Sequence, residues 1–115
     1  MIKQALNILG TEYTICIATD REDSALKEMD GYCDKTVKKI AILDKPEDAG
    51  VTSVQDFSVY QRKILRHEII HAFLFESGLH ENWEHKTGHD ETYVDWIAAQ
   101  FPKLAKIFED AGCLT

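Results

Sequence analysis

The sequence predicts an α+β domain, because strand-like segments fill residues 1–44 and helical patterns fill the C-terminal half. Residues 13–17 alternate in strand-like fashion and residues 40–43 form a short apolar run, whereas residues 53–112 carry apolar side chains at helical spacing. Strands that come first and helices that follow favour an α+β arrangement over a wound parallel sheet. A chain of 115 residues has the length of one domain, so we expect a single domain over residues 1–115.

The strand-rich half is expected to form a small sheet of three or four strands. Gly10-Thr11 marks the turn of a hairpin, and Asp20 can cap a short helix over residues 21–29 that Gly31 ends. Turn residues separate the apolar runs, as in strand pairs. The predicted strands cover residues 5–9, 12–18, 31–35 and 38–43.

A long helix is predicted to open the C-terminal half. Ser53 and Asp56 resemble a capping box, in which a side chain at the helix start accepts a backbone N–H. Apolar side chains then recur at helical spacing as far as Phe75. Gly78 is a natural stop, because glycine readily takes the left-handed conformation that ends many helices. We therefore expect one helix to run from this capping box to Gly78.

Two further helices are expected after the long one. The first should begin near Asp90, which can cap it, and carries apolar residues at helical spacing. Pro102 suits the first turn of a helix, where no backbone N–H is needed, so it predicts a separate last helix over residues 102–111. Gly112 is expected to end that helix.

Composition excludes several classes of function. There are 13 Lys+Arg against 20 Asp+Glu, a net charge of −7, which argues against nucleic acid as a partner. No apolar run approaches the ~20 residues of a membrane helix, and the first residues are too polar for a secretory signal. Cys16, Cys33 and Cys113 are an odd set without CxxC spacing, so we expect buried free thiols and a cytoplasmic location.

His67-Glu68-Ile69-Ile70-His71 is an HExxH motif inside the predicted long helix. Four residues advance a helix by slightly more than one turn, so both imidazoles lie on one face, ~6 Å apart along the axis. Two ring nitrogens at this spacing can reach a single Zn²⁺ at ~2.0–2.1 Å. Glu68 is close to both and can accept a proton from metal-bound water. The motif therefore predicts His67 and His71 as zinc ligands and Glu68 as the general base.

The third ligand has several candidates. Glu91 lies 20 residues beyond His71 (91 − 71 = 20), and Asp95 follows it on the same helical face. In this arrangement Glu91 can reach the metal, while Asp95 can accept the free N–H of a ligand imidazole. Other residues of the intervening segment could bind instead, namely His80, His85, His89 and Asp90.

The motif at 67–71, followed by Glu91-Thr-Tyr-Val-Asp95, resembles the gluzincin clan of zinc peptidases, which combine HExxH with a later ExxxD. The chain is most similar to small ImmA/IrrE-type peptidases of phages and mobile elements. This resemblance implies a minimal zincin-like fold, in which the sheet packs on the HExxH helix and a second helix brings Glu91 to the metal. It also implies that His67, His71 and Glu91 bind zinc, that Glu68 is the base and that Asp95 supports a ligand. By the same resemblance, residues 37–43 form the edge strand along which a peptide lies.

We therefore expect a zinc peptidase that hydrolyses a peptide bond in a protein substrate. The alternative is a metal-binding or interaction module that keeps the scaffold without proteolysis. A peptidase needs an open fourth metal position, whereas a fourth ligand such as His85 or His89 would close it. A histidine as third ligand would favour SprT-like proteases, whose basic surface the charge of −7 disfavours. We expect no nucleic-acid or membrane partner, and the sequence does not indicate an oligomeric state.

Overall fold

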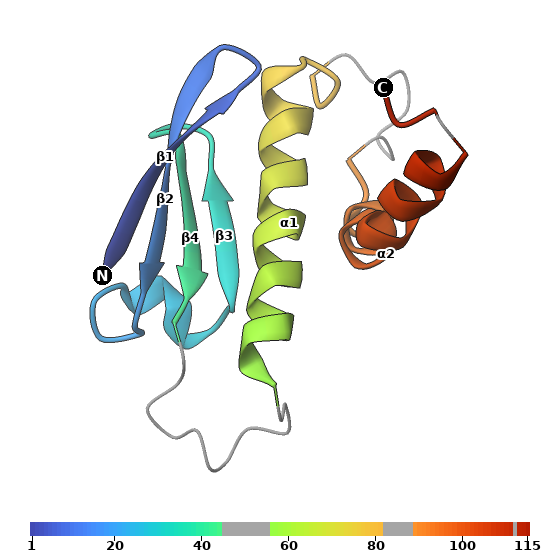
Figure 1. Cartoon of the computed structure of the whole chain (residues 1–115). Helices are drawn as coiled ribbons and strands as arrows, with labels where there is room; N and C mark the ends of the chain where they lie inside the picture. Colours follow the sequence, from blue (N-terminus) through green and yellow to red (C-terminus); the bar gives the residue numbers. More distant parts are fainter. Residues whose placement is uncertain (45–55, 82–88, 112) are drawn as a thin grey trace.

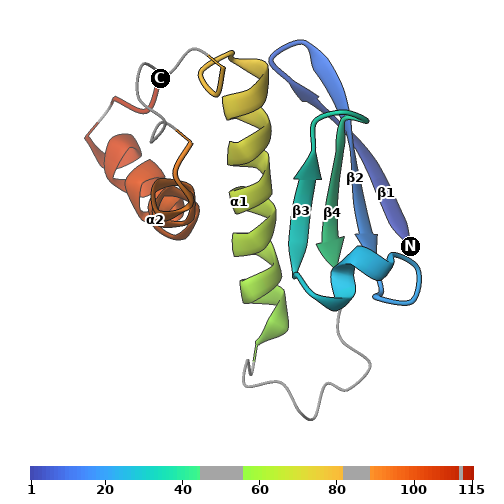
Figure 2. The ribbon, with the colours of Figure 1, turned by 180° about the vertical axis from the view of Figure 1, so that it is seen from behind.

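The computed structural model is a small α+β arrangement of strands and two long helices, which confirms the predicted fold class (Figure 1). It describes residues 1–44, 56–81, 89–111 and 113–115. Figures 1 and 2 show the sheet on one side of α1 and α2 on the other, so that α1 is the middle layer. The elements are β1 (Ile2–Ile8), β2 (Thr11–Ala18), the 3₁₀-helix η1 (Ser24–Lys27), β3 (Gly31–Asp34), β4 (Lys39–Leu43), α1 (Phe57–Glu76) and α2 (Glu91–Asp110).

The sheet is mixed, with strand order β1-β2-β4-β3. The hairpin of β1 and β2 and the antiparallel pair of β3 and β4 were both expected, whereas the parallel pairing of β2 with β4 was not. The hairpin turn lies at Leu9-Gly10, one residue before the predicted Gly10-Thr11, because Thr11 already pairs with Ile8. Leu9 and Gly10 have φ angles of 52° and 92°, as a two-residue hairpin turn with two positive φ angles requires.

Strand β4 lies inside the sheet, so the expectation that residues 37–43 form an edge is wrong. Ile40 and Ile42 pack toward α1, while Ala41 and Leu43 pack on the opposite face with Leu26 of η1. A strand buried on both faces has a continuous apolar run, as Ile40–Leu43 has. The parallel pairing with β2 leaves β1 and β3 as the two edges.

The short helix after β2 is smaller than predicted. Asp23, not Asp20, caps η1 by accepting the Ala25 N–H. The preceding residues are held in a turn, because Thr19 and Glu22 exchange hydrogen bonds and Asp23 donates to the Thr19 carbonyl. The helix predicted over residues 21–29 is therefore limited to four residues, Ser24–Lys27.

Helix α1 packs its apolar face on the sheet. Asp56 caps its start by accepting the Val59 N–H, while Ser53 lies outside the described residues. Gly78, with a φ of 79°, follows the end of the helix as predicted. The contact surface combines strand residues (Ile8, Tyr13, Ile15, Ile40 and Ile42) with helix residues (Ile64, Leu65, Ile69 and Ala72).

Helix α2 is one continuous helix from Glu91 to Asp110, so the separate helix predicted over 102–111 is wrong. Pro102 lies inside it and cannot donate a backbone hydrogen bond to the Ala98 carbonyl. Arg66 of α1 donates its Nε–H to that carbonyl at 2.7 Å. This contact satisfies the carbonyl that Pro102 leaves free and connects the two helices. Gly112 lies outside the described residues.

The cysteines differ in burial. Cys16 is buried as expected, Cys33 is half-buried, and Cys113 is exposed because it lies beyond the end of α2. The cytoplasmic location inferred from the cysteine set stays a prediction. Within the described residues, no helix combines the length and apolar character needed to cross a membrane.

A half-buried polar contact fixes the C-terminal end of α1 on the hairpin. Glu76 accepts hydrogen bonds from Tyr13 at 2.7 Å and from Thr11 at 3.1 Å, and forms an ion pair with Lys38 at 2.6 Å. Lys38 first, and then Tyr13, lower the pKa of Glu76 below its usual value of 4.5. A lowered pKa means that the folded state favours the ionised carboxylate.

We expect the contact of Glu76 to make stability depend on pH. Its contribution is fully present above the ordinary pKa of 4.5 and is lost as the pH falls through the lowered value in the folded protein. The difference in unfolding free energy between the wild type and Glu76→Gln should therefore shrink as the pH falls below 4.5. Urea unfolding of both proteins across this pH range measures the difference, with Glu109→Gln at the exposed end of α2 as the control. A difference that stays constant with pH would contradict the lowered pKa of Glu76 in the folded protein.

The Arg66 contact predicts coupling to Pro102. Arg66→Ala should lower the unfolding free energy by about 1.5–3 kcal/mol, because it leaves the Ala98 carbonyl without a donor. In a Pro102→Ala background, the backbone N–H of residue 102 can donate to the Ala98 carbonyl. Arg66→Ala should then lower the unfolding free energy by less than it does in the wild type. A double-mutant cycle by urea unfolding measures this coupling. Additive effects of the two substitutions would show that Arg66 does not replace the missing donor.

Candidate metal centre

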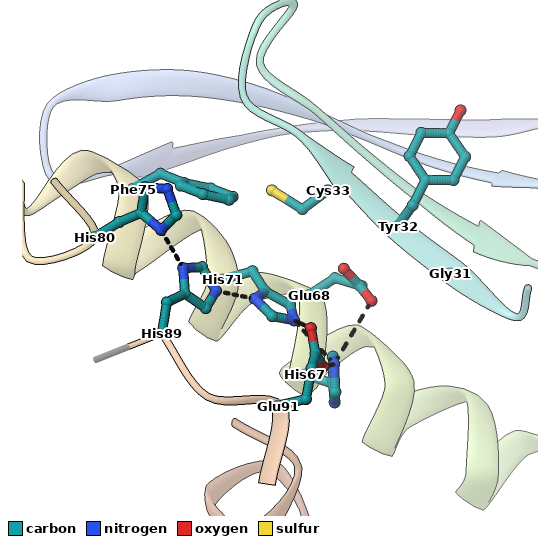
Figure 3. A pocket seen from close by; sticks show the side chains of 10 residues that line it. All are labelled: Gly31, Tyr32, Cys33, His67, Glu68, His71, Phe75, His80, His89 and Glu91. Carbon is teal, nitrogen blue, oxygen red and sulfur yellow. Dashed lines mark hydrogen bonds and ion pairs between the residues drawn. The ribbon is translucent and has the colours of Figure 1, made fainter. Parts of the chain in front are cut away.

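Helix α1 places the three polar residues of the HExxH motif on one flank, facing a cavity (Figure 3). One helical turn brings the Nε2 atoms of His67 and His71 to 3.0 Å from each other. His71 is 8% exposed, and Glu68 is 7% exposed. Buried polar groups require partners, so this flank depends on contacts from other elements.

Glu91 supplies the contact from α2. It is the first residue of that helix, and its two carboxylate oxygens lie 3.0 Å from His67 Nε2 and 3.0 Å from His71 Nε2. One ligand atom from each of His67, His71 and Glu91 lies within 4.8 Å of the others, so the group could hold a metal ion. Ligands at ~2.0–2.1 Å in tetrahedral geometry are separated by about 3.3 Å, close to these separations. Sequence spacing predicted His67 and His71, and it gave Glu91 as one of several candidates for the third position.

Asp95 lies one turn further along α2 and contacts the other ring nitrogen of His67. Its Oδ1 atom is 3.2 Å from His67 Nδ1 and 3.1 Å from Lys63 Nζ. The hydrogen bond from Lys63 is the main cause that holds the pKa of Asp95 below its usual value, and His67 adds to it. An ionised Asp95 can accept the Nδ1–H of His67, which leaves His67 Nε2 free to bind a metal.

The other candidate ligands of the sequence take different positions. His89 contacts Nδ1 of His71, not the Nε2 side where Glu91 lies, and His80 Nδ1 is 2.7 Å from His89 Nδ1. Asp90 caps α2 by accepting the Thr92 N–H at 2.6 Å. His85 lies outside the described residues. Among the described residues, the candidate ligand group therefore consists of His67, His71 and Glu91.

The pKa of Glu68 is raised to about 7. Burial is the main cause, the charge of Glu91 adds to it, and His67 opposes it. The Glu68 carboxyl lies 3.9 Å from His67 Nε2. A carboxyl group with a pKa near neutrality can both accept and release a proton under ordinary conditions.

The cavity beside these residues has a volume of about 520 Å³ and is bounded by α1, the start of α2 and strand β3. Figure 3 shows Cys33 of β3 across the cavity from His71 and Glu68. Burial first, and then the charge of Glu68, raise the pKa of the Cys33 thiol to about 12. The thiol is therefore protonated near neutral pH and is unsuited to act as a nucleophile. The sequence did not indicate that β3 lines the site, because that depends on strand order.

Comparisons with protein-family models, with curated proteins and with solved structures found no match to this chain.

The geometry predicts that His67→Ala prevents stable metal binding, because it removes one of three ligands. Zinc content after equilibration with Zn²⁺ and removal of excess should fall from one ion per chain to a trace. The zinc affinity should therefore fall by more than the about 10–100-fold that follows when a residue supporting a metal ligand is removed. Glu68→Gln is the matched control, since it changes a buried polar residue of the same helix but no ligand. Unchanged zinc content in His67→Ala would exclude His67 as a ligand.

Proposed function

We propose that this protein is a zinc-dependent peptidase in which Glu68 acts as the general base. The observation that carries the proposal is the buried Glu68 carboxyl beside a group of two imidazoles and one carboxylate, all facing one cavity. This combination matches what hydrolysis requires, namely a candidate metal site, a proton acceptor and space for a substrate.

The donor set supports zinc as the metal. Two imidazole nitrogens and one carboxylate oxygen are a ligand set of catalytic zinc sites, which keep a fourth position open. Burial, the main cause, lowers the pKa of His71 and so favours the neutral imidazole that a metal ligand requires. When bound, zinc polarises a carbonyl group and makes a coordinated water more acidic.

Glu68 is placed to move the protons of the reaction. Its carboxyl faces the cavity and lies 3.9 Å from His67 Nε2, so it can accept a proton from the attacking water and then give it to the leaving amine. The neighbouring Glu91 carboxylate is 72% exposed, so it contacts both histidines from the open side of the cavity. The peptide bond would therefore enter between the Glu91 side and β3.

We further propose that β3, rather than residues 37–43, pairs with the substrate. Strand β3 is an edge of the sheet, and Gly31, Tyr32 and Cys33 line the cavity. An extended peptide can add to such an edge through backbone hydrogen bonds, which would hold its scissile bond beside the metal group. The resemblance to gluzincins of the ImmA/IrrE type also implied an edge strand that holds a peptide, but at residues 37–43, which the strand order excludes. A protein segment is the substrate class we propose.

The alternative, a metal-binding or interaction module without proteolysis, would be favoured by a fourth protein ligand that closes the metal site, such as His85 or His89. The contact of His89 with His71 is on the Nδ1 side of the ring, away from Glu91. His85 lies outside the described residues, among which the candidate ligand group has three members, as an open site requires.

Glu68→Gln should abolish peptidase activity while zinc content and folding are kept. Removal of a general base typically costs about 10²–10⁴-fold in rate. The measurement is cleavage of a random quenched-fluorescence peptide library by the zinc-loaded wild type and variant, with Glu109→Gln as an exposed control. Wild-type activity in Glu68→Gln would contradict the role of Glu68. A zinc-loaded wild type that cleaves nothing would favour the non-proteolytic module.

A further inference from the structure

The geometry points to His89 as a positioning residue for His71, an inference that rests on the proposed metal site. His89 lies just before α2, and its Nε2 atom is in hydrogen-bond contact with Nδ1 of His71 (Figure 3). The two rings lie nearly parallel, with centroids 4.6 Å apart and an interplanar angle of 29°. His89 thus holds the edge of the His71 ring that faces away from Glu91.

Metal binding leaves only one arrangement of protons on these rings. When Nε2 of neutral His71 is a ligand, its proton is on Nδ1 and needs an acceptor. The atom in contact there is Nε2 of His89, which accepts only if the His89 proton is on Nδ1. That proton can then be donated to His80 Nδ1, 2.7 Å away. The proton of His80 is then on Nε2, the atom 4.0 Å from Glu81.

Packing around Phe75 holds His89 and His80 in place. The centroid of the Phe75 ring lies 4.9 Å from that of His89 and 4.8 Å from that of His80. The rings of His80 and His89 meet nearly at right angles, with centroids 4.8 Å apart. Phe75 also lies one turn beyond His71 on α1, so the cluster is built on the helix that carries the ligand.

The two ligand imidazoles are therefore supported differently. Asp95 accepts from Nδ1 of His67 and is itself held by Lys63, whereas His89 accepts from Nδ1 of His71 and is held by His80. Each ligand thus has its own acceptor on the ring edge opposite the metal. Acceptors in this position fix the tautomer and the ring orientation of a metal ligand.

The test compares His89→Leu with His89→Gln, which are similar in size but differ in whether residue 89 can accept a hydrogen bond. Zinc affinity is measured by competition with a chromophoric chelator. We expect His89→Leu to bind zinc about 10–100-fold more weakly than the wild type, and His89→Gln to recover most of that loss. Urea unfolding of the metal-free variants shows whether both are folded at the concentrations used.

A spectroscopic measurement separates positioning from a structural role. In zinc-loaded protein with ¹⁵N-labelled histidine, the Nδ1–H signal of His71 should be protected from exchange with water in the wild type and lost in His89→Leu. Asp95→Ala is the matched control, which should remove the corresponding signal of His67 and leave that of His71.

Each outcome decides the role of His89. Equal zinc affinities of the wild type and His89→Leu, with an unchanged His71 signal, would overturn the inference while leaving the metal site intact. Loss of zinc as complete as in His67→Ala, not recovered by His89→Gln, would make His89 a ligand and also overturn it. Absence of zinc binding by the wild type would instead refute the proposed metal site, and the inference with it.

Discussion

Helix α1 must bury an apolar face against the sheet while its neighbouring flank keeps Glu68 and His71 out of water. Removal of a carboxyl and an imidazole from solvent is costly unless other groups pair with them. The flank therefore requires polar partners: His71 contacts Glu91 at the start of α2 and His89 before it, whereas Glu68 lies beside His67 of α1 itself. The need of His71 for partners thus connects the start of α2 to the HExxH flank of α1, where the candidate metal group and the cavity lie.

Contacts along α1 limit how it can move relative to both neighbouring layers. At its end Glu76 contacts the hairpin and Lys38, and in its middle Arg66 contacts the Ala98 carbonyl of α2. A catalytic arrangement has to be held within about 0.5 Å, which isolated helices do not achieve. These contacts lie on either side of the motif along α1, so they fix the helix against the sheet and against α2 where the histidines meet Glu91.

Local patterns predicted the parts of the fold that depend on neighbours in sequence. Helical spacing placed His67 and His71 together, and turn residues indicated the two antiparallel strand pairs. The parallel pairing of β2 with β4 joins segments separated by η1 and β3, and its one local sign was the continuous apolar run Ile40–Leu43. Pro102 suggested a break because proline costs about 3 kcal/mol inside a helix. Arg66, which is 32 positions before Ala98 in the sequence, supplies the donor that the Ala98 carbonyl lacks, and no local pattern can indicate this contact.

The order of strands decides which part of the sheet can meet a substrate. Because β4 pairs with β2, it is internal, and β3 becomes the edge beside α1. Gly31 allows this approach, since a Cβ atom there would lie 2.8 Å from Ile64 of α1 and 3.1 Å from Ile42. A larger residue at position 31 would force either β3 or the side chain of Ile64 to shift. The parallel pair and one glycine therefore bring the edge strand and the candidate metal group to the same cavity, which neither the HExxH motif nor the strand pattern specifies alone.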